Sequence, residues 1–232
     1  MKLSVFIALS LLTCEFINAQ SAIDFANITK YKDENTAILN SKKKVDVVFM
    51  GNSITEGWVK SHPEFFTENN YTGRGISGQT TSQMLLRFQN DVVSLKPELV
   101  VINAGTNDIA QNTGVYDPDF TFNNIKSMAD IAKNNGIKVI IASVLPAAAF
   151  PWRKEITEVP QKVEALNNRL KQYANNNKFI FVDYNTAMRD TKGGMREGLS
   201  KDGIHPLPEG YAIMEPLIKN AINKTLGKKI KI

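Results

Sequence analysis

The chain alternates between short apolar runs and longer segments in which apolar residues recur every three or four positions. A continuous apolar run is typical of a strand buried on both faces of a sheet, whereas the wider spacing is typical of a helix with one buried side. Five runs predict strands, at residues 45–51, 71–77, 98–105, 137–146 and 178–185. Four spaced segments predict helices, at residues 80–95, 119–136, 159–177 and 208–226.

Strands that alternate with helices along the chain predict a parallel sheet covered on both faces. We therefore expect the α/β class, as a three-layer α/β/α sandwich. Right-handed crossovers favour a five-stranded sheet in the flavodoxin-like order 2-1-3-4-5. In the helix at 119–136 we expect Phe120, Ile125 and Met128 on the buried side, and we expect Pro216 to kink the last helix. Residues 20–44 are polar and predict a lead-in helix or extended arm.

The first 19 residues have the pattern of a secretory signal peptide. A positive charge at Lys2 precedes the apolar stretch 3–12, and a small residue follows at Ala19. Cleavage after Ala19 would leave a lead-in segment at 20–44 and one folded domain at 45–232. We expect export to the periplasm or beyond the cell. The alternative is a lipoprotein anchored at Cys14.

Composition narrows the possible chemistry and partners. Cys14 is the only cysteine, so cleavage would leave no disulfide, no thiol nucleophile and no cysteine metal site. The net charge is +5, with lysines clustered at 42–44 and 228–231. These clusters lack interleaved aromatic residues, so we expect no nucleic-acid partner. Solvated chain ends are the simplest interpretation, and contact with a polyanion or membrane surface is the alternative. No further apolar segment is long enough to predict stable membrane insertion.

Polar loops that contain glycine leave three of the predicted strands. They hold Gly51-Asn52-Ser53, residues 73–80 and residues 105–108. In an open parallel sheet the carboxyl ends of the strands lie at one edge, and sites form where the winding direction switches. We therefore expect these loops to meet in one place, between strands one and three.

A serine after a strand is more often a helix cap than a nucleophile, so Ser53 requires a partner base. The chain has two histidines. His62 is expected to be an ordinary exposed residue. His205 follows Asp202 by three positions, and this spacing allows the carboxylate to accept from Nδ1–H and leave Nε2 free to accept a proton. The alternative for this segment is a plain Asp-Gly turn.

An acyl-transfer site also needs donors for the developing oxyanion. Gly78 can offer a backbone N–H, Asn107 a side-chain amide and Ser53 its own N–H. Taken singly, Gly78 is equally well explained as a turn glycine and Asn107 as part of an Asx turn. Together these residues indicate an acyl-transfer site more specifically, because all of them follow strand ends at one edge of the sheet.

These residues resemble the SGNH, or GDSL-type, hydrolase family of esterases and lipases. Its four blocks are similar to GNSITEG at 51–57, GRGISGQT at 73–80, GTND at 105–108 and DGIHP at 202–206. The resemblance implies that Ser53, Asp202 and His205 are catalytic and that Ser53, Gly78 and Asn107 form the oxyanion hole. It extends from about residue 45 to 224. The first block commonly has Asp before the serine, where this chain has Asn52, which keeps hydrogen bonding but loses a charge.

The predicted activity is therefore ester hydrolysis through an acyl-enzyme, with no cofactor and no metal. We expect a small-molecule or carbohydrate ester substrate, with removal of acetyl or other short acyl groups from sugars. Trp58, Phe150 and Trp152 lie in predicted loops and are expected to contact the substrate, although ordinary packing is the alternative. A lysophospholipase or arylesterase, a non-catalytic carbohydrate-binding module and a metal phosphoesterase remain as alternative functions. The sequence leaves the oligomeric state open.

Overall fold

The structure is a computed structural model that describes residues 24–41 and 44–227. The predicted signal peptide at 1–19, with Cys14, lies outside the described residues. So do the lysines at 42–43 and 228–231. Among the residues that are described, no helix has both the length and the apolar character needed to cross a bilayer.

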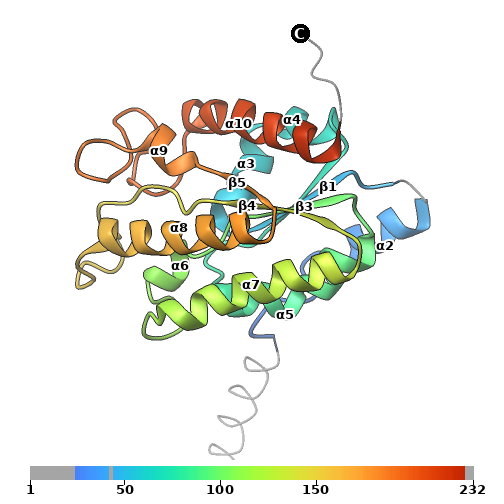
Figure 1. The fold of residues 1–232 in the computed structure, drawn as a ribbon, viewed down its shortest axis with the longest axis horizontal. Helices are drawn as coiled ribbons and strands as arrows, with labels where there is room; N and C mark the ends of the chain where they lie inside the picture. Colours follow the sequence, from blue (N-terminus) through green and yellow to red (C-terminus); the bar gives the residue numbers. More distant parts are fainter. Residues whose placement is uncertain (1–23, 42–43, 228–232) are drawn as a thin grey trace, which may run out of the picture.

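Five strands form one parallel sheet in the order β2-β1-β3-β4-β5, which confirms the predicted topology (Figure 1). The strands are β1 (Val47–Gly51), β2 (Tyr71–Gly75), β3 (Leu99–Ile102), β4 (Lys138–Ala142) and β5 (Ile180–Val182). Each is shorter than its predicted run, because residues at the ends of the run, apolar ones included, belong to the connecting loops. All residues of the central strands β1 and β3 are buried, as a sheet covered on both faces requires.

The four predicted helical segments are helical. The helices are α2 (Lys32–Ser41), α3 (Ser53–Ser61), α4 (Pro63–Thr67), α5 (Thr81–Asp91), η1 (Val93–Leu95), α6 (Thr106–Ile109), α7 (Pro118–Asn134), α8 (Val159–Asn176), α9 (Tyr184–Met188) and α10 (Pro208–Leu226). The short helices α3, α4, α6 and α9 were not predicted separately, because fewer than three turns give no clear periodic pattern. The last helix, α10, continues through Pro216 as one element.

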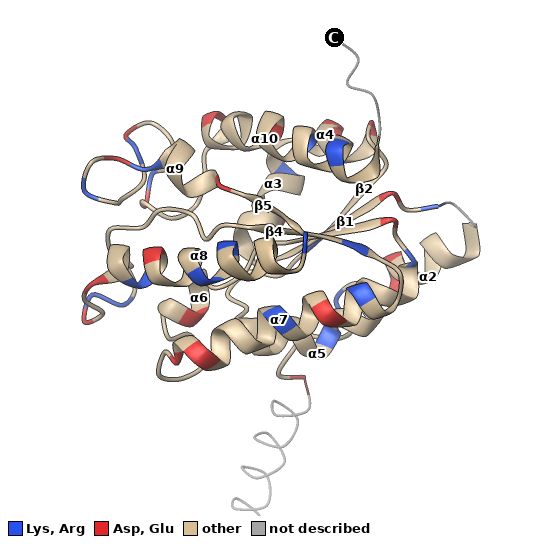
Figure 2. Ribbon diagram, viewed as in Figure 1, with Lys and Arg blue, Asp and Glu red and all other residues tan. Residues whose placement is uncertain are grey.

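Two hydrophobic layers cover the sheet. On one face, α5, α7 and α8 pack against Val48 and Met50 of β1. On the other face, α3, α4 and α10 pack against Val47 and Phe49. Alternate residues of β1 therefore point into opposite layers. Charged residues lie mainly on the outer helices and in the loops (Figure 2).

The predicted inclusion of Phe120 in the buried side of α7 is wrong, because its side chain is 55% exposed. Buried positions on this helix are Thr121, Asn124, Ile125, Met128, Ala129 and Ala132. With about 100° of rotation per residue, these positions span an arc of roughly 140° on one side of the helix. Phe120, in the first turn, lies about 40° outside that arc and is exposed.

A buried arginine joins the carboxyl ends of β1 and β2. Arg87 of α5 is fully buried and donates to the carbonyl oxygens of Gly51 and Arg74, each at 2.9 Å. It also donates to the Gln79 side chain at 2.6 Å and forms a 2.9 Å ion pair with Asp91. A buried guanidinium is stable only when its donors are satisfied, so these contacts fix the two strand ends relative to one another.

Candidate active site

Ser53, His205 and Asp202 form a continuous hydrogen-bonded chain at the carboxyl edge of the sheet. Ser53 Oγ lies 2.8 Å from His205 Nε2. On the other side of the ring, Nδ1 lies 2.6 Å from Asp202 Oδ2. The serine follows β1, whereas the other two residues lie 149 and 152 positions further along the chain, between α9 and α10. The fold therefore brings together the three residues predicted to be catalytic, in the order required for proton transfer.

Hydrogen bonds hold Asp202 in its charged form. Partial desolvation alone would raise its pKa. The His205 ring, with the N–H groups of Ile204 and His205, outweighs that effect and holds the pKa of Asp202 well below its usual range. Ser200 adds a further hydrogen bond from its hydroxyl at 3.0 Å. A charged Asp202 carboxylate favours the imidazole tautomer with its proton on Nδ1, so Nε2 is the nitrogen that can accept from Ser53.

Asn52 caps the helix that begins at Ser53. Its Oδ1 accepts the Ile54 N–H at 3.0 Å, and its side chain is almost fully buried. This contact needs an acceptor oxygen but no negative charge, so the amide can replace the carboxylate common at this position. Ser53 is the first residue of α3, and its own N–H has no partner within the helix.

The three predicted oxyanion donors, Ser53, Gly78 and Asn107, follow the carboxyl ends of the neighbouring strands β1, β2 and β3. Gly78 belongs to the oxyanion loop, residues 76–80, and has φ +77°, a conformation that favours glycine. An added Cβ there would meet no atom within 4 Å, so the residue borders open space. Asn107 Nδ2 donates to the Gln79 carbonyl at 2.9 Å, and its second amide hydrogen has no acceptor among the described residues. The N–H of Gly78 makes no hydrogen bond within the part of the chain that the structure describes.

Asp108 is a supporting residue that the sequence analysis did not single out. Its carboxylate accepts the Thr81 N–H at 3.1 Å and the Thr81 hydroxyl at 2.5 Å. Burial raises its pKa against the effect of these hydrogen bonds. Asp108 therefore ties the loop after β3 to the start of α5, next to the oxyanion loop. In the sequence, its position directly after Asn107 was the feature that could have indicated this supporting role.

The three aromatic residues predicted to contact the substrate differ in position. Trp152 is 43% exposed, and its ring lies 6.2 Å from that of His205 at an interplanar angle of 29°. Phe150 is fully buried in one hydrophobic layer, and Trp58 is 2% exposed in the other. The prediction is therefore wrong for Trp58 and Phe150, whose faces are covered by protein. Trp58 itself belongs to α3 rather than to a loop.

His62 is not the ordinary exposed histidine that we expected. It is the residue between α3 and α4, and 17% of its side chain is exposed. Its Nδ1 contacts the Glu215 carboxylate, which also accepts from Trp58 Nε1 at 3.1 Å. His62 thus belongs to a structural group between α3 and α10. Its neighbour in that group comes from a distant segment, so the local sequence gave no indication of it.

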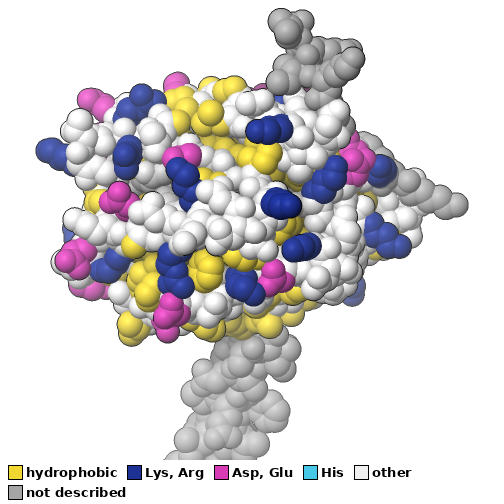
Figure 3. Space-filling view, viewed as in Figure 1, with side chains coloured by type: hydrophobic (Ala, Val, Ile, Leu, Met, Phe, Trp, Pro, Cys, Tyr) yellow, Lys and Arg dark blue, Asp and Glu magenta, His cyan; other side chains and the backbone are white. Residues whose placement is uncertain are grey.

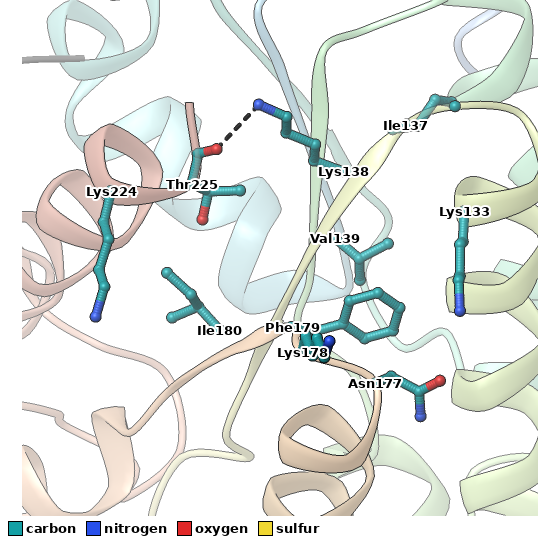
Figure 4. Close-up of a pocket in the computed structure, with 11 residues that line it drawn as sticks. Lys133, Ile137, Lys138, Val139, Asn177, Lys178, Phe179, Ile180, Lys224 and Thr225 are labelled. Atoms are coloured by element: carbon teal, nitrogen blue, oxygen red, sulfur yellow. Dashed lines mark hydrogen bonds between the residues drawn. The ribbon is translucent and has the colours of Figure 1, made fainter. Parts of the chain in front are cut away.

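A groove of about 520 Å³ lies at the opposite, amino-terminal edge of β4 and β5 (Figure 4). Four lysines line it: Lys133, Lys138, Lys178 and Lys224. The last turns of α7, α8 and α10 end nearby, and Lys138 donates to the Thr225 carbonyl of α10 at 3.0 Å. Helix carboxyl ends favour cations, which accounts for lysines here. Lys and Arg side chains are also scattered singly over the face in Figure 3, between apolar patches. Because the helix ends already account for the lysines of this groove, we place the candidate active site at the triad.

The chain is similar over most of its length to known lipases and esterases. Residues 49–213 match the model of the GDSL-like lipase/acylhydrolase family. A crystallised GDSL-like lipase from Bacteroides thetaiotaomicron is 57% identical, with a TM-score of 0.82 over 86% of this chain and 98% of that one. Esterase TesA of Pseudomonas aeruginosa is 27% identical over 161 residues, 68% of this chain and 73% of its own. An acetyl xylan esterase, AlAXEase, has a TM-score of 0.61 over 76% of this chain and 99% of its own. It is 21% identical, a level that shows a shared fold alone.

Proposed function

The chain belongs to the GDSL-like lipase/acylhydrolase family and is a carboxylic ester hydrolase, and we propose that it removes acetyl or other short acyl groups from carbohydrate by a serine mechanism. The hydrogen-bonded chain of Ser53, His205 and Asp202 is the observation that supports the mechanism. The exposed ring of Trp152 beside His205 is the observation that supports the substrate class.

In the first half of the reaction, His205 Nε2 accepts the proton of the Ser53 hydroxyl as Oγ attacks the ester carbonyl. The 2.8 Å separation between these atoms suits this transfer. Asp202 holds the opposite side of the ring and stabilises the imidazolium that forms. The proton then passes from Nε2 to the departing alcohol oxygen, and the acyl group stays on Ser53.

The carbonyl oxygen becomes negatively charged during this attack and again during hydrolysis. The backbone N–H groups of Ser53 and Gly78 and the free amide hydrogen of Asn107 are the proposed donors. Because other contacts hold these groups in place, little reorganisation is needed as charge develops. In the second half, His205 accepts a proton from water as the water oxygen attacks the acyl carbon. The bond between that carbon and Ser53 Oγ then breaks, the carboxylic acid leaves, and His205 Nε2 returns the proton to Oγ.

The surroundings of the triad favour an ester substrate whose alcohol portion is bulky and polar. The side chains of His205 and Asp202 are 41% and 40% exposed, so the site is open to solvent. Trp152 lies next to it with part of its ring uncovered. An aromatic face provides a flat apolar surface for stacking, as the C–H faces of a sugar require. The acetyl xylan esterase that shares the fold is named for a substrate of this kind. The amino-terminal pattern leads us to propose export, which would place the enzyme with extracellular carbohydrate.

Two measurements test the proposal. Ser53→Ala should lose hydrolysis of p-nitrophenyl acetate, with the melting temperature unchanged as the control for folding. Near-normal turnover by this variant would reject the serine mechanism. A fluorophosphonate should label wild type and not Ser53→Ala, whereas a non-catalytic binding module would give no label at all.

The substrate class requires a separate comparison. Wild type should release acetate from acetylated xylo-oligosaccharides, and kcat/KM on p-nitrophenyl esters should fall as the acyl chain lengthens from acetate to octanoate. Preference for octanoate, or for lysophospholipid over the acetylated sugar, would instead assign the triad to a lipid substrate.

A further inference from the structure

Glu56 connects the helix that carries Ser53 to the oxyanion loop. It lies three residues after the serine, and its Oε2 accepts both the N–H of Ser77 at 2.8 Å and the Ser77 hydroxyl at 2.6 Å. Ser77 immediately precedes Gly78 in the oxyanion loop. One carboxylate oxygen therefore fixes both the backbone and the side chain of the residue next to a proposed oxyanion donor.

The second oxygen of Glu56 is neutralised by two lysines. Oε1 accepts from Lys30 Nζ at 2.9 Å and from Lys60 Nζ at 3.0 Å. Only 14% of the Glu56 side chain is exposed. An unpaired carboxylate close to the site would oppose negative charge on the substrate oxygen, and Lys30, the less exposed of the two partners, reduces that repulsion. Lys30 comes from the segment before α2, so this amino-terminal segment takes part in the arrangement.

The loop is also held on the other side of Gly78. Asn112 Nδ2 donates to the Gly78 carbonyl at 3.1 Å. Gln79 Nε2 donates to the Ala26 carbonyl at 2.6 Å, again in the segment before α2. The Gly78 N–H lies between these supports and, among the described residues, donates to no acceptor. Glycine is the residue with the greatest backbone freedom, so its orientation depends on its neighbours being fixed.

We propose that Glu56 is a positioning residue for the oxyanion hole, acting through Ser77 to direct the Gly78 N–H at the substrate oxygen. This inference rests on the proposed serine mechanism and adds a determinant of its rate. Catalysis by an oxyanion donor depends on the donor being oriented before charge develops. Loss of the Glu56 contacts should therefore slow the chemical step more than it weakens substrate binding.

The test compares Glu56→Ala with Glu56→Gln on p-nitrophenyl acetate. Glu56→Ala should lower kcat by about 10- to 100-fold and change KM by less than about threefold. Glu56→Gln keeps an acceptor oxygen for Ser77 and should recover most of the lost kcat. Lys60→Ala is the matched control. It removes an exposed partner from Oε1 and leaves both Ser77 contacts, so kcat should stay within about twofold of wild type.

Ser77→Ala provides a second measurement if Glu56→Ala does not fold. It removes only the hydroxyl contact and should lower kcat by about three- to fivefold with KM little changed. The proposal is overturned if kcat of Glu56→Ala, or of Ser77→Ala where that variant decides, stays within twofold of wild type. A loss in Glu56→Ala that Glu56→Gln does not recover also overturns it. Turnover by Ser53→Ala would reject the proposed mechanism itself, whereas inactive Ser53→Ala beside unaffected Glu56 variants would reject only the role of Glu56.

Discussion

The ring of Trp152 stacks beside the ring of His205, with centroids 6.2 Å apart and planes inclined by 29°. The indole Nε1 donates to Asn112 Oδ1 at 3.2 Å, and Asn112 in turn donates to the Gly78 carbonyl. Trp152 is thus an exposed aromatic surface that contacts the proposed general base and is fixed to the loop that carries an oxyanion donor.

Trp152→Ala should raise KM for an acetylated oligosaccharide by about 2- to 10-fold, because a stacking surface contributes about 0.5 to 1.5 kcal/mol. The increase should be smaller for p-nitrophenyl acetate, whose alcohol portion is not a sugar. Trp152→Phe keeps an aromatic face and should recover part of the loss. Equal KM changes for both substrates would argue against a sugar-stacking role.

Substitution of Trp58 should affect stability rather than substrate binding, since its ring stacks between Phe65 and Tyr211 inside the core. The centroid distances are 5.2 and 5.5 Å, with interplanar angles of 13° and 18°. Trp58→Ala should destabilise the protein by about 3 to 5 kcal/mol, whereas Trp152→Ala should have little effect on stability. Urea denaturation of both variants checks this contrast. A similar midpoint for the two would contradict the assignment of Trp58 to the core.

The fold and the proximity of the polar loops could both be predicted from the sequence, and for the same reason. In a parallel sheet of known order the carboxyl ends of the strands lie along one edge, so the residues that follow them must be near one another. Ser53, Gly78 and Asn107 each follow a strand by only a few residues. Their proximity therefore follows from topology, without knowledge of any side-chain conformation.

What the sequence could not predict depends on contacts between distant segments. The sequence around Trp58 and Trp152 does not indicate which ring is covered, and only tertiary packing distinguishes the covered ring from the exposed one. Glu56, with Lys60 four positions later, looks like a solvated pair on a helix surface. Its contact with Ser77 arises because α3 lies next to the end of β2, a proximity that periodicity does not reveal.

Asn107→Ala tests the side-chain donor of the oxyanion hole. Removal of one such donor costs about 3 kcal/mol in the transition state, so kcat on p-nitrophenyl acetate should fall by about 100-fold or more. KM should change far less, because the contact strengthens as charge develops. The variant also loses the hydrogen bond to the Gln79 carbonyl, so its melting temperature must be measured in parallel. A rise in KM with unchanged kcat would contradict the assignment.

The ion pairs of Glu56 predict a specific dependence of stability on pH. Desolvation alone would raise its pKa, but hydrogen bonds from Ser77, Lys30 and Lys60 lower it from 4.5 to about 2. Because the folded state has the lower pKa, the contribution to stability is complete above about pH 4.5 and is lost as the pH falls towards 2. The full change in pKa would correspond to about 3.4 kcal/mol, and solvent screening of the exposed lysine partners reduces the contribution to about 2 kcal/mol.

Urea denaturation of wild type and Glu56→Gln at pH 6 and pH 2.5 checks this dependence. Wild type should be more stable at pH 6, and the difference between the two proteins should shrink at pH 2.5. Lys60→Ala serves as a control that keeps the carboxylate and its Ser77 contacts. An equal difference at both pH values would show that Glu56 does not titrate between them in the folded protein.

Tyr184 and Tyr211 are a matched pair of buried tyrosines that differ in one hydrogen bond. Both side chains are at most 2% exposed. The Tyr211 hydroxyl donates to the Ile54 carbonyl at 2.9 Å, whereas the Tyr184 hydroxyl has no partner in the described part of the chain. A buried polar group without a partner is destabilising, so its removal in a variant of the same shape should be neutral or favourable.

Tyr184→Phe should therefore leave the free energy of unfolding unchanged or raise it by about 1 kcal/mol, which corresponds to about 2 to 4 °C in melting temperature. Tyr211→Phe should lower the free energy of unfolding by about 1 kcal/mol, because the hydrogen bond from the Tyr211 hydroxyl to the Ile54 carbonyl is lost. Thermal denaturation of the two variants, compared with wild type, measures the difference directly. Equal losses in both variants would mean that Tyr184 has a hydrogen-bond partner in solution, which for a hydroxyl this deeply buried would be an ordered water.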